Sequence, residues 1–256
     1  MPGFEAPDLD TLTLELVDEA VVLMRLNRPH RMNAMTVAMF TEFNLVATAL
    51  RDSGVRALIM AGAGDRAFCS GFDLDEIKVI GEMGIREFLR FQELAAGGLA
   101  ALRALPFPVI AAVHGAASGG GLSLALSADI RLAAPTAKFN AAFVRVGLSA
   151  GELGTSWTLT RLVGPGRAAE IAFTGRNVDA AEALRIGLVN HVIPAADLLD
   201  EALALARQIS VNPAAGVRMA KRALQRNLEV ASYGAALELA NRGQALLSFT
   251  GRSRAH

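Results

Sequence analysis

The chain has 256 residues, with 25 basic and 25 acidic side chains and a formal net charge of zero. This length suits one domain, or one and a half, with a full hydrophobic core. The single cysteine, Cys69, excludes a disulfide scaffold and a zinc site built from clustered Cys and His, and the balanced charge argues against a protein that binds duplex nucleic acid.

The first 24 residues carry six acids and no Lys or Arg, unlike the basic start of a secretory leader. Residues 104–128 carry no charged side chain, but Pro106, Pro108 and the segment GAASGGG (115–121) would expose broken backbone to lipid. We therefore expect a soluble, cytoplasmic protein with no membrane partner.

In the first hundred residues, hydrophobic patterning predicts strands and helices in alternation. Apolar, β-branched runs predict strands over residues 12–17, 20–26 and 55–61. Helical spacing predicts helices over residues 36–51, which Thr36 caps, and 85–103. This alternation is typical of an α/β protein.

The middle of the chain continues the alternation, and the end does not. Residues 107–113 are apolar throughout, which predicts a strand of a parallel sheet covered on both faces. Further elements are expected as a helix over 121–128, a strand over 129–134, helices over 155–163, 165–174 and 179–187, and a strand over 188–193. Only helices follow, to about residue 248. We expect an α/β core over residues 1–194 and a helical subdomain over residues 195–256.

One glycine motif resembles a nucleotide-binding fingerprint. Residues 62–67 (GAGDRA) follow a predicted strand and match the pattern G-x-G-x-x-A. That fingerprint requires a helix that begins within the motif, and residues 68–74 contain another glycine and no helix start. The hypothesis of a nicotinamide-dependent oxidoreductase therefore depends on this motif alone.

Two other glycine turns, each directly after an apolar strand, favour a different chemistry. They are FCSGFDL (68–74) and HGAASGGGLSLALSAD (114–129), and the second runs into a helix. Glycine allows backbone to approach a ligand closely, and a helix start leaves N–H groups unpaired. Two such N–H groups can converge on one oxygen and stabilise an oxyanion. Each turn taken alone is equally compatible with ordinary packing of a helix on a sheet.

Together these turns resemble the crotonase superfamily, the enoyl-CoA hydratases and isomerases. The resemblance extends over nearly the whole chain, in the segments NRPHRMNAMT (27–36), AFCSGFDL (67–74), PVIAAVHGAASGGGLSLALSADI (108–130), AKF (137–139), VGL (146–148), TRLVG (160–164), TGR (174–176) and AAEALRIGLVNHVIP (180–194). It implies a crotonase-type spiral of ββα units followed by C-terminal helices for oligomerisation, as a homotrimer or a dimer of trimers.

The resemblance also implies an acyl-CoA thioester as substrate and no separate cofactor or metal. Two backbone N–H groups would hold the thioester oxygen, and by position these belong to Phe72 and Gly120. The residues implied in coenzyme A binding are Arg28, Arg31, Met32, Ala34, Ala67, Ser70, Gly71, Asp73, Leu74 and Gly119. The arginines would offer positive charge to the phosphates.

The chain departs from the family pattern at both glutamates that a hydratase uses to activate water. The corresponding positions hold Ser123 and Phe143, which would line the acyl pocket. Neither side chain exchanges a proton near neutral pH as a carboxylate does. Hydration by the usual two-acid mechanism is therefore not expected.

An acid remains in the loop that precedes residue 155. Family isomerases carry a carboxylate in this loop, and Glu152 lies one position later than theirs. A single carboxylate can take a proton from one carbon and return it to another, so we expect a double-bond isomerase with Glu152 as the acid and base. The alternatives are a helix-capping role for Glu152, hydration by an atypical route, and an acyl-CoA-binding protein without catalysis.

Overall fold

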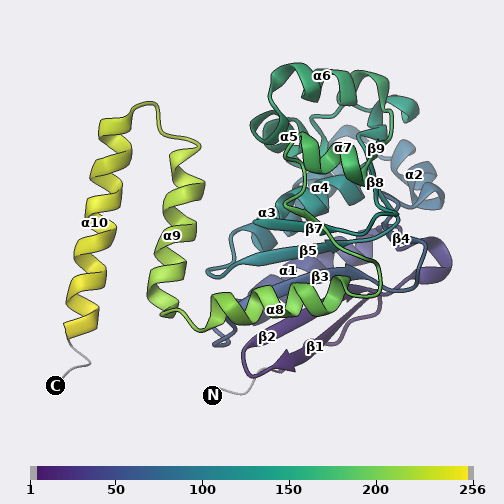
Figure 1. The fold of residues 1–256 in the computed structure, drawn as a ribbon. Coiled ribbons are helices and arrows are strands. Elements are labelled where there is room, and N and C mark those ends of the chain that lie inside the picture. The colour runs from purple at the N-terminus through teal and green to yellow at the C-terminus, as the bar shows by residue number, and fades with distance from the viewer. Residues whose placement is uncertain (1–4, 253–256) are drawn as a thin grey trace.

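The computed structural model describes residues 5–252 (Figure 1). The strands are β1 (Leu12–Asp18), β2 (Val21–Leu26), β3 (Ala57–Gly62), β4 (Ala67–Cys69), β5 (Val109–Val113), β6 (Ala116–Ser118), β7 (Ile130–Ala133), β8 (Lys138–Asn140), β9 (Val178–Asp179) and β10 (His191–Val192). The α-helices are α1 (Val37–Arg51), α2 (Leu74–Gly81), α3 (Ile85–Arg103), α4 (Gly120–Ser127), α5 (Thr155–Val163), α6 (Pro165–Thr174), α7 (Ala180–Arg185), α8 (Leu198–Ser210), α9 (Ala214–Asn227) and α10 (Tyr233–Arg252). Three short 3-10 helices are η1 (Pro29–Arg31), η2 (Ala142–Val146) and η3 (Glu152–Gly154).

The strands form two sheets, and the chain passes repeatedly from one to the other. The larger sheet has the order β1-β2-β3-β5-β7-β10, and the smaller has the order β4-β6-β8-β9. Thus β3, β5 and β7 each lie in the larger sheet, and each is followed by a short strand in the smaller one. This arrangement is the spiral of ββα units implied by the resemblance, so the predicted fold class is confirmed.

Alternate residues of the larger sheet face two different cores. Val21, Leu23 and Ile59 face α8, which supplies Leu198 and Ala202 to that core. The strand residues that alternate with these point to the other face, where they pack against the long helices α1 and α3 and against α4. The sheet is therefore covered on both faces, as its uninterrupted apolar strands predict.

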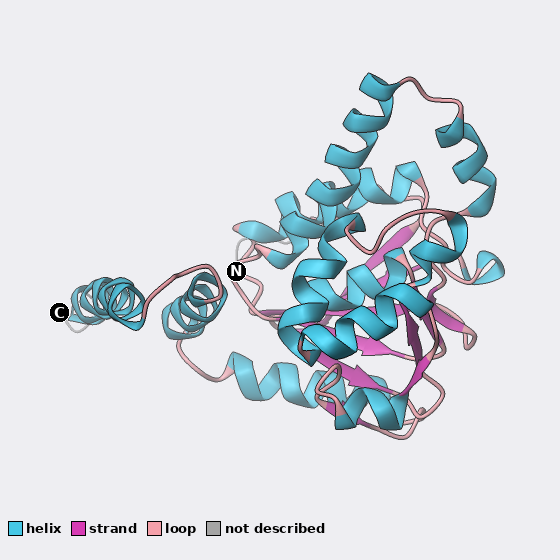
Figure 2. Ribbon diagram, turned by 90° about the horizontal axis from the view of Figure 1, so that it is seen from above, coloured by secondary structure: helices cyan, strands magenta, loops and turns pink. Residues whose placement is uncertain are grey.

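Helix α8 belongs to this covering layer, although the sequence assigns it to the C-terminal subdomain. Helices α9 and α10 instead form a hairpin that lies apart from the sheets, as both views show (Figures 1 and 2). One anchor of α9 is Lys221, a buried lysine whose Nζ donates to the Phe107 carbonyl at 2.8 Å and lies 2.7 Å from the Asp129 carboxylate. No helix within residues 5–252 has the length and apolar character that crossing a membrane requires.

Candidate active site

Two backbone amides, those of Phe72 and Gly120, lie close together where the two glycine turns meet. A Cβ atom added to Gly71 would lie 3.7 Å from the Gly120 nitrogen, and one added to Gly120 would lie 3.9 Å from the Phe72 nitrogen. Gly71 has a φ of 103°, a conformation that favours glycine. The turns that carry the two predicted oxyanion donors are therefore in direct contact.

The hydrogen-bond pattern leaves both of these N–H groups available. Met35 pairs with the chain on either side of Phe72, donating to the Gly71 carbonyl and accepting from the Asp73 amide, so the Phe72 N–H faces away from this pair. Gly120 begins α4, where the first N–H groups have no partner within the helix. Each amide can therefore donate to an incoming oxygen.

Apolar side chains lie beside Gly119 and Gly120. The Met35 Sδ and the Leu153 Cδ1 would lie 3.2 and 3.5 Å from a Cβ atom at Gly120. The Phe143 ring lies 3.8 Å from the corresponding position at Gly119. Because an apolar environment has a low dielectric constant, it strengthens the attraction between an N–H dipole and a negative oxygen.

The Phe72 side chain joins an aromatic cluster with residues of α1 and α3. Its ring stacks on Phe40 at a centroid distance of 5.9 Å and lies 5.5 Å from the ring of Phe91. This packing holds the turn that carries the Phe72 amide against the two longest helices of the core. The side chain of Phe72 thus belongs to the packing, and only its main chain is a candidate for the site.

Glu152 lies in η3, the turn that immediately precedes α5, and is half-buried. Its amide donates to the Ser149 carbonyl at 3.2 Å. Its carboxylate makes no hydrogen bond or ion pair with any part of the chain from 5 to 252. The next residue, Leu153, adopts a left-handed backbone conformation with φ 51°, and its side chain lies beside Gly120. The turn that carries the predicted acid thus adjoins one oxyanion donor.

Ser123 and Phe143, which replace the two hydratase glutamates, are both buried. The Ser123 Oγ donates to the Gly119 carbonyl at 3.2 Å and lies 2.6 Å from the Thr155 Oγ1. The polar atom at the first glutamate position is therefore engaged within the protein, and the second position presents a hydrocarbon ring. The fold offers no carboxylate at either place.

The implied coenzyme A segment, from Arg28 to Ala34, packs along the turn that contains Gly71. The Ser70 amide donates to the Met32 carbonyl at 3.0 Å, and the Asp73 amide donates to the Met35 carbonyl at 2.8 Å. Ala34 and Ala67 are buried, Gly119 has a φ of 51°, and the side chain of Leu74 is exposed. The fold thus brings the residues from both implied segments together along one line of backbone contacts.

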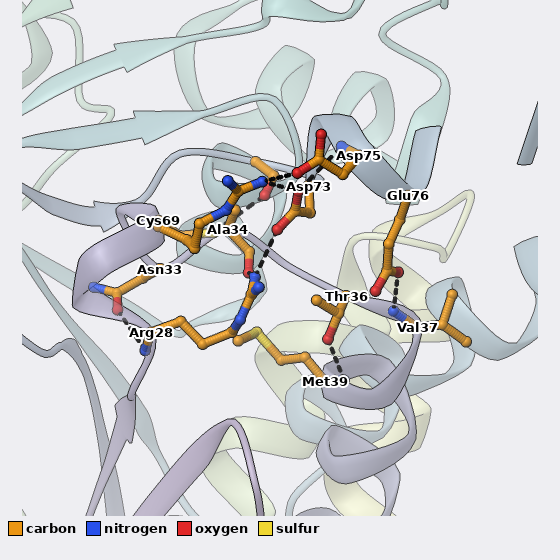
Figure 3. A network of polar contacts seen from close by, with 12 residues as sticks. Arg28, Asn33, Ala34, Thr36, Val37, Met39, Cys69, Asp73, Asp75 and Glu76 are labelled. Carbon is orange, nitrogen blue, oxygen red and sulfur yellow. Dashed lines mark hydrogen bonds and ion pairs between the residues drawn. The ribbon is translucent and has the colours of Figure 1, made fainter. Parts of the chain in front are cut away.

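Asp73 binds both arginines of this segment, and Figure 3 shows its contact with Arg28. Its carboxylate accepts from Arg28 at 2.9 Å and from Arg31 at 2.8 Å, and Arg31 also pairs with Asp75. The hydrogen bond from Arg31 lowers the pKa of Asp73 to about 2, and Arg28 acts in the same direction against the effect of burial. Two carboxylates thus offset two guanidinium groups in the segment implied in phosphate binding.

The sequence patterns do not single out Asn33, although it organises this segment. It is fully buried with a φ of 55°, and its Oδ1 accepts from the Arg28 amide. Its Nδ2 donates to the carbonyls of Ala63 and Ala67 at 2.9 and 2.8 Å. A sequence signal existed, because asparagine is among the few residues that tolerate this left-handed conformation.

Known proteins resemble this chain in sequence and in fold. The family model described as enoyl-CoA hydratase/isomerase matches residues 17–246. A protein of Mycobacterium leprae, named a probable enoyl-CoA hydratase, is 41% identical over 228 residues, covering 87% of this chain and 77% of the relative.

Two solved structures extend the likeness to three dimensions. A monofunctional enoyl-CoA isomerase of M. smegmatis is 40% identical with a TM-score of 0.75, covering 89% of this chain and 98% of the other. A protein of Thermobifida fusca, solved in complex with acetoacetyl-CoA, is 33% identical with a TM-score of 0.84, covering 93% of this chain and 95% of the other. The chain therefore belongs to the enoyl-CoA hydratase/isomerase family of acyl-CoA enzymes.

Proposed function

We propose that this enzyme moves a double bond within an enoyl-CoA thioester and that Glu152 is its acid and base. One observation carries the proposal: the two adjacent oxyanion amides are retained, whereas both hydratase glutamates are replaced by the buried residues Ser123 and Phe143. An enolate can thus be stabilised at a site that lacks the usual means of activating water.

In the proposed reaction, the thioester oxygen accepts hydrogen bonds from the Phe72 and Gly120 amides. The Glu152 carboxylate removes a proton from the carbon next to the thioester carbonyl, and negative charge moves onto the oxygen. The same proton then returns to a carbon farther along the acyl chain, which shifts the double bond. No water is added, and the carboxylate is restored at the end of the cycle.

Coenzyme A is proposed to lie along the loop from Arg28 to Ala34 and along the facing turn, which contains Ser70 and Gly71. The complex of the Thermobifida fusca protein with acetoacetyl-CoA supports an acyl-CoA ligand for this fold. The Arg31 side chain is 42% exposed, so its guanidinium can reach a phosphate while it remains near Asp73. We place the enzyme in the cytoplasm and propose that it assembles as a homotrimer or a dimer of trimers.

Hydration by an atypical route is the second candidate, because relatives such as the Mycobacterium leprae protein are named hydratases. A spectroscopic assay with 2-enoyl-, 3-enoyl- and dienoyl-CoA separates the candidates. Interconversion of 2- and 3-enoyl-CoA without a 3-hydroxyacyl product supports the isomerase. Formation of 3-hydroxyacyl-CoA from 2-enoyl-CoA supports the hydratase, and tight acyl-CoA binding without turnover supports a non-catalytic protein.

A further inference from the structure

We infer that the buried Ser123–Thr155 hydroxyl pair is a positioning device that fixes the Glu152 turn relative to the oxyanion amide of Gly120. This inference rests on the proposed function, because it concerns how the acid and the oxyanion donor are held at a fixed position relative to each other. Ser123 is expected to line the acyl pocket, but its hydroxyl is engaged with the Gly119 carbonyl and with Thr155, so the pair acts by positioning other groups.

Each member of the pair lies three residues after one of the two groups that the pair connects. Ser123 lies three residues after Gly120 in the first turn of α4, and Thr155 lies three residues after Glu152 at the start of α5. Their oxygens are 2.6 Å apart, and the residues are only 2% and 0% exposed. One short hydrogen bond thus ties the helix that begins with an oxyanion donor to the helix that follows the acid.

A second hydrogen bond of Ser123 connects the pair to the peptide group between Gly119 and Gly120. Ser123 has one hydroxyl hydrogen, which it donates to the Gly119 carbonyl at 3.2 Å. Within the pair either oxygen could be the donor, and donation from Thr155 to Ser123 leaves the Ser123 hydrogen for the Gly119 carbonyl. The Gly119 carbonyl belongs to the peptide group whose N–H is the Gly120 donor, so this chain of hydrogen bonds bears directly on the orientation of that donor.

The Glu152 turn requires such a restraint. Leu153 adopts a left-handed conformation that disfavours residues with a Cβ atom, so the surrounding structure must hold it. Three observed contacts do so: Leu153 packs near Gly120, the Ser156 amide donates to the Ala150 carbonyl at 2.7 Å, and Thr155 binds Ser123. Of these three contacts, the hydroxyl pair is the one made by a hydrogen bond between side chains. A small displacement of a catalytic group can reduce the rate of catalysis strongly.

Three variants and one control test this role. Thr155→Val keeps the shape and removes the hydroxyl, Ser123→Ala removes its partner, and Thr155→Ser retains the hydrogen bond. Thr48→Val is the control, because Thr48 is an exposed helical residue whose hydroxyl donates to the Asn44 carbonyl at 2.8 Å. Melting temperatures show which variants are folded.

The first measurement does not depend on turnover. Acetoacetyl-CoA forms an enolate with its own near-ultraviolet absorbance, and oxyanion donors should lower the pKa of the bound ligand. We expect Thr155→Val and Ser123→Ala to raise this pKa relative to the wild type, and Thr155→Ser and Thr48→Val to leave it nearly unchanged. A ligand pKa that is unchanged in folded Thr155→Val and Ser123→Ala overturns the inference, as does a wild type that does not enolise the ligand.

The second measurement uses 3-enoyl-CoA. Thr155→Val should lower kcat about tenfold, because a displaced Glu152 turn is less well placed for proton transfer, while KM changes by less than about twofold. Thr155→Ser should restore most of kcat. If the wild type does not isomerise 3-enoyl-CoA, the proposed function fails, and the acetoacetyl-CoA titration still decides the role of the pair.

Discussion

At the scale of single residues, Asp73 is the polar centre of the candidate coenzyme A loop. Its buried carboxylate binds Arg28 and Arg31 and accepts from the Asp75 amide at the start of α2 at 3.1 Å. These hydrogen bonds hold the carboxyl group in its charged form. A residue assigned to ligand binding by resemblance is thus also part of the structural framework.

Replacing Asp73 should destabilise the protein in a pH-dependent way. Asp73→Asn should lower the free energy of unfolding at pH 7 by about 1–3 kcal/mol, because two guanidinium groups lose an anionic partner. The folded-state pKa of about 2 lies below the ordinary value of 3.8, so the charge stabilises the fold above about pH 4, and this contribution falls as the pH drops toward 2. Denaturant unfolding of both proteins at pH 7, 5, 4 and 3 checks this. A stability difference that does not shrink at low pH would contradict it.

The Cys69 thiol should be unreactive in the native protein. The side chain is fully buried in β4, and burial raises the pKa of the thiol to about 12. Since only the thiolate reacts with alkylating reagents, iodoacetamide at pH 8 should modify native protein more than about a hundredfold more slowly than unfolded protein. Mass spectrometry over time measures both rates. Equal rates would show that β4 does not shield the thiol.

At the scale of elements, the contact between α4 and β4 fixes the position of α4, the helix that begins at the candidate oxyanion donor Gly120. A Cβ atom at Gly121 would come within 2.1 Å of the Cys69 carbonyl oxygen, so only glycine permits this approach. The first turn of α4 therefore rests directly on the backbone of the small sheet. This close contact keeps the Gly120 amide near that of Phe72.

Gly121→Ala should accordingly force α4 away from β4. We expect a loss of about 1–3 kcal/mol in the free energy of unfolding, together with weaker enolate formation from acetoacetyl-CoA. Gly166→Ala in α6 is the matched control, because a Cβ atom there would meet nothing within 4 Å. That change should be neutral or slightly stabilising. Chemical denaturation compares the two variants, and equal stabilities would refute the close-packing account.

Long elements could be predicted from the sequence, whereas the small sheet could not. The helix predicted over residues 85–103 has the bounds of α3, and Thr36 caps α1 as expected by accepting from the Met39 amide. Strands β4, β6 and β8 have three residues each, too few for a periodic pattern to emerge. The strand predicted over residues 188–193 is shorter, because the amides of Leu188 and Val189 bind the Ala183 carbonyl and close a turn.

Only the parts of the site that lie within the family motifs could be predicted from the sequence. The motifs placed the two glycine turns that the fold brings into contact, and they revealed the replaced hydratase positions. The roles of Thr155 and Asn33 depend on hydrogen bonds that span 32 and 34 residues in the sequence. Such contacts arise only after the sheets and helices have packed, so local patterns do not reveal them.

At the scale of the whole molecule, the α9–α10 hairpin exposes more apolar surface than an isolated subunit would favour. Its exposed large apolar residues include Leu224, Leu228, Tyr233, Leu237, Leu239 and Phe249. Exposed apolar surface of this kind is typical of an association site. It accords with the proposed trimer, in which neighbouring subunits would cover the hairpin.

The oligomeric state should therefore depend on this hairpin. The wild type should have the mass of a trimer or a hexamer in light scattering. Leu224→Glu places a charge on a residue of α9 that is 72% exposed and should shift the mass toward the monomer. Leu16→Glu on the edge strand β1, 49% exposed, is the control and should leave the mass unchanged. A monomeric wild type would contradict the proposed assembly.

In the proposed reaction, Glu152 transfers the proton between two carbons of the acyl chain. The most direct test is the rate at which Glu152→Gln interconverts 3-enoyl- and 2-enoyl-CoA, with Glu87→Gln on the exposed surface of α3 as the control. We predict that kcat falls at least about a hundredfold in Glu152→Gln, as expected for loss of an acid–base group, while the control retains its activity. A Glu152→Gln enzyme with the wild-type rate would contradict this account.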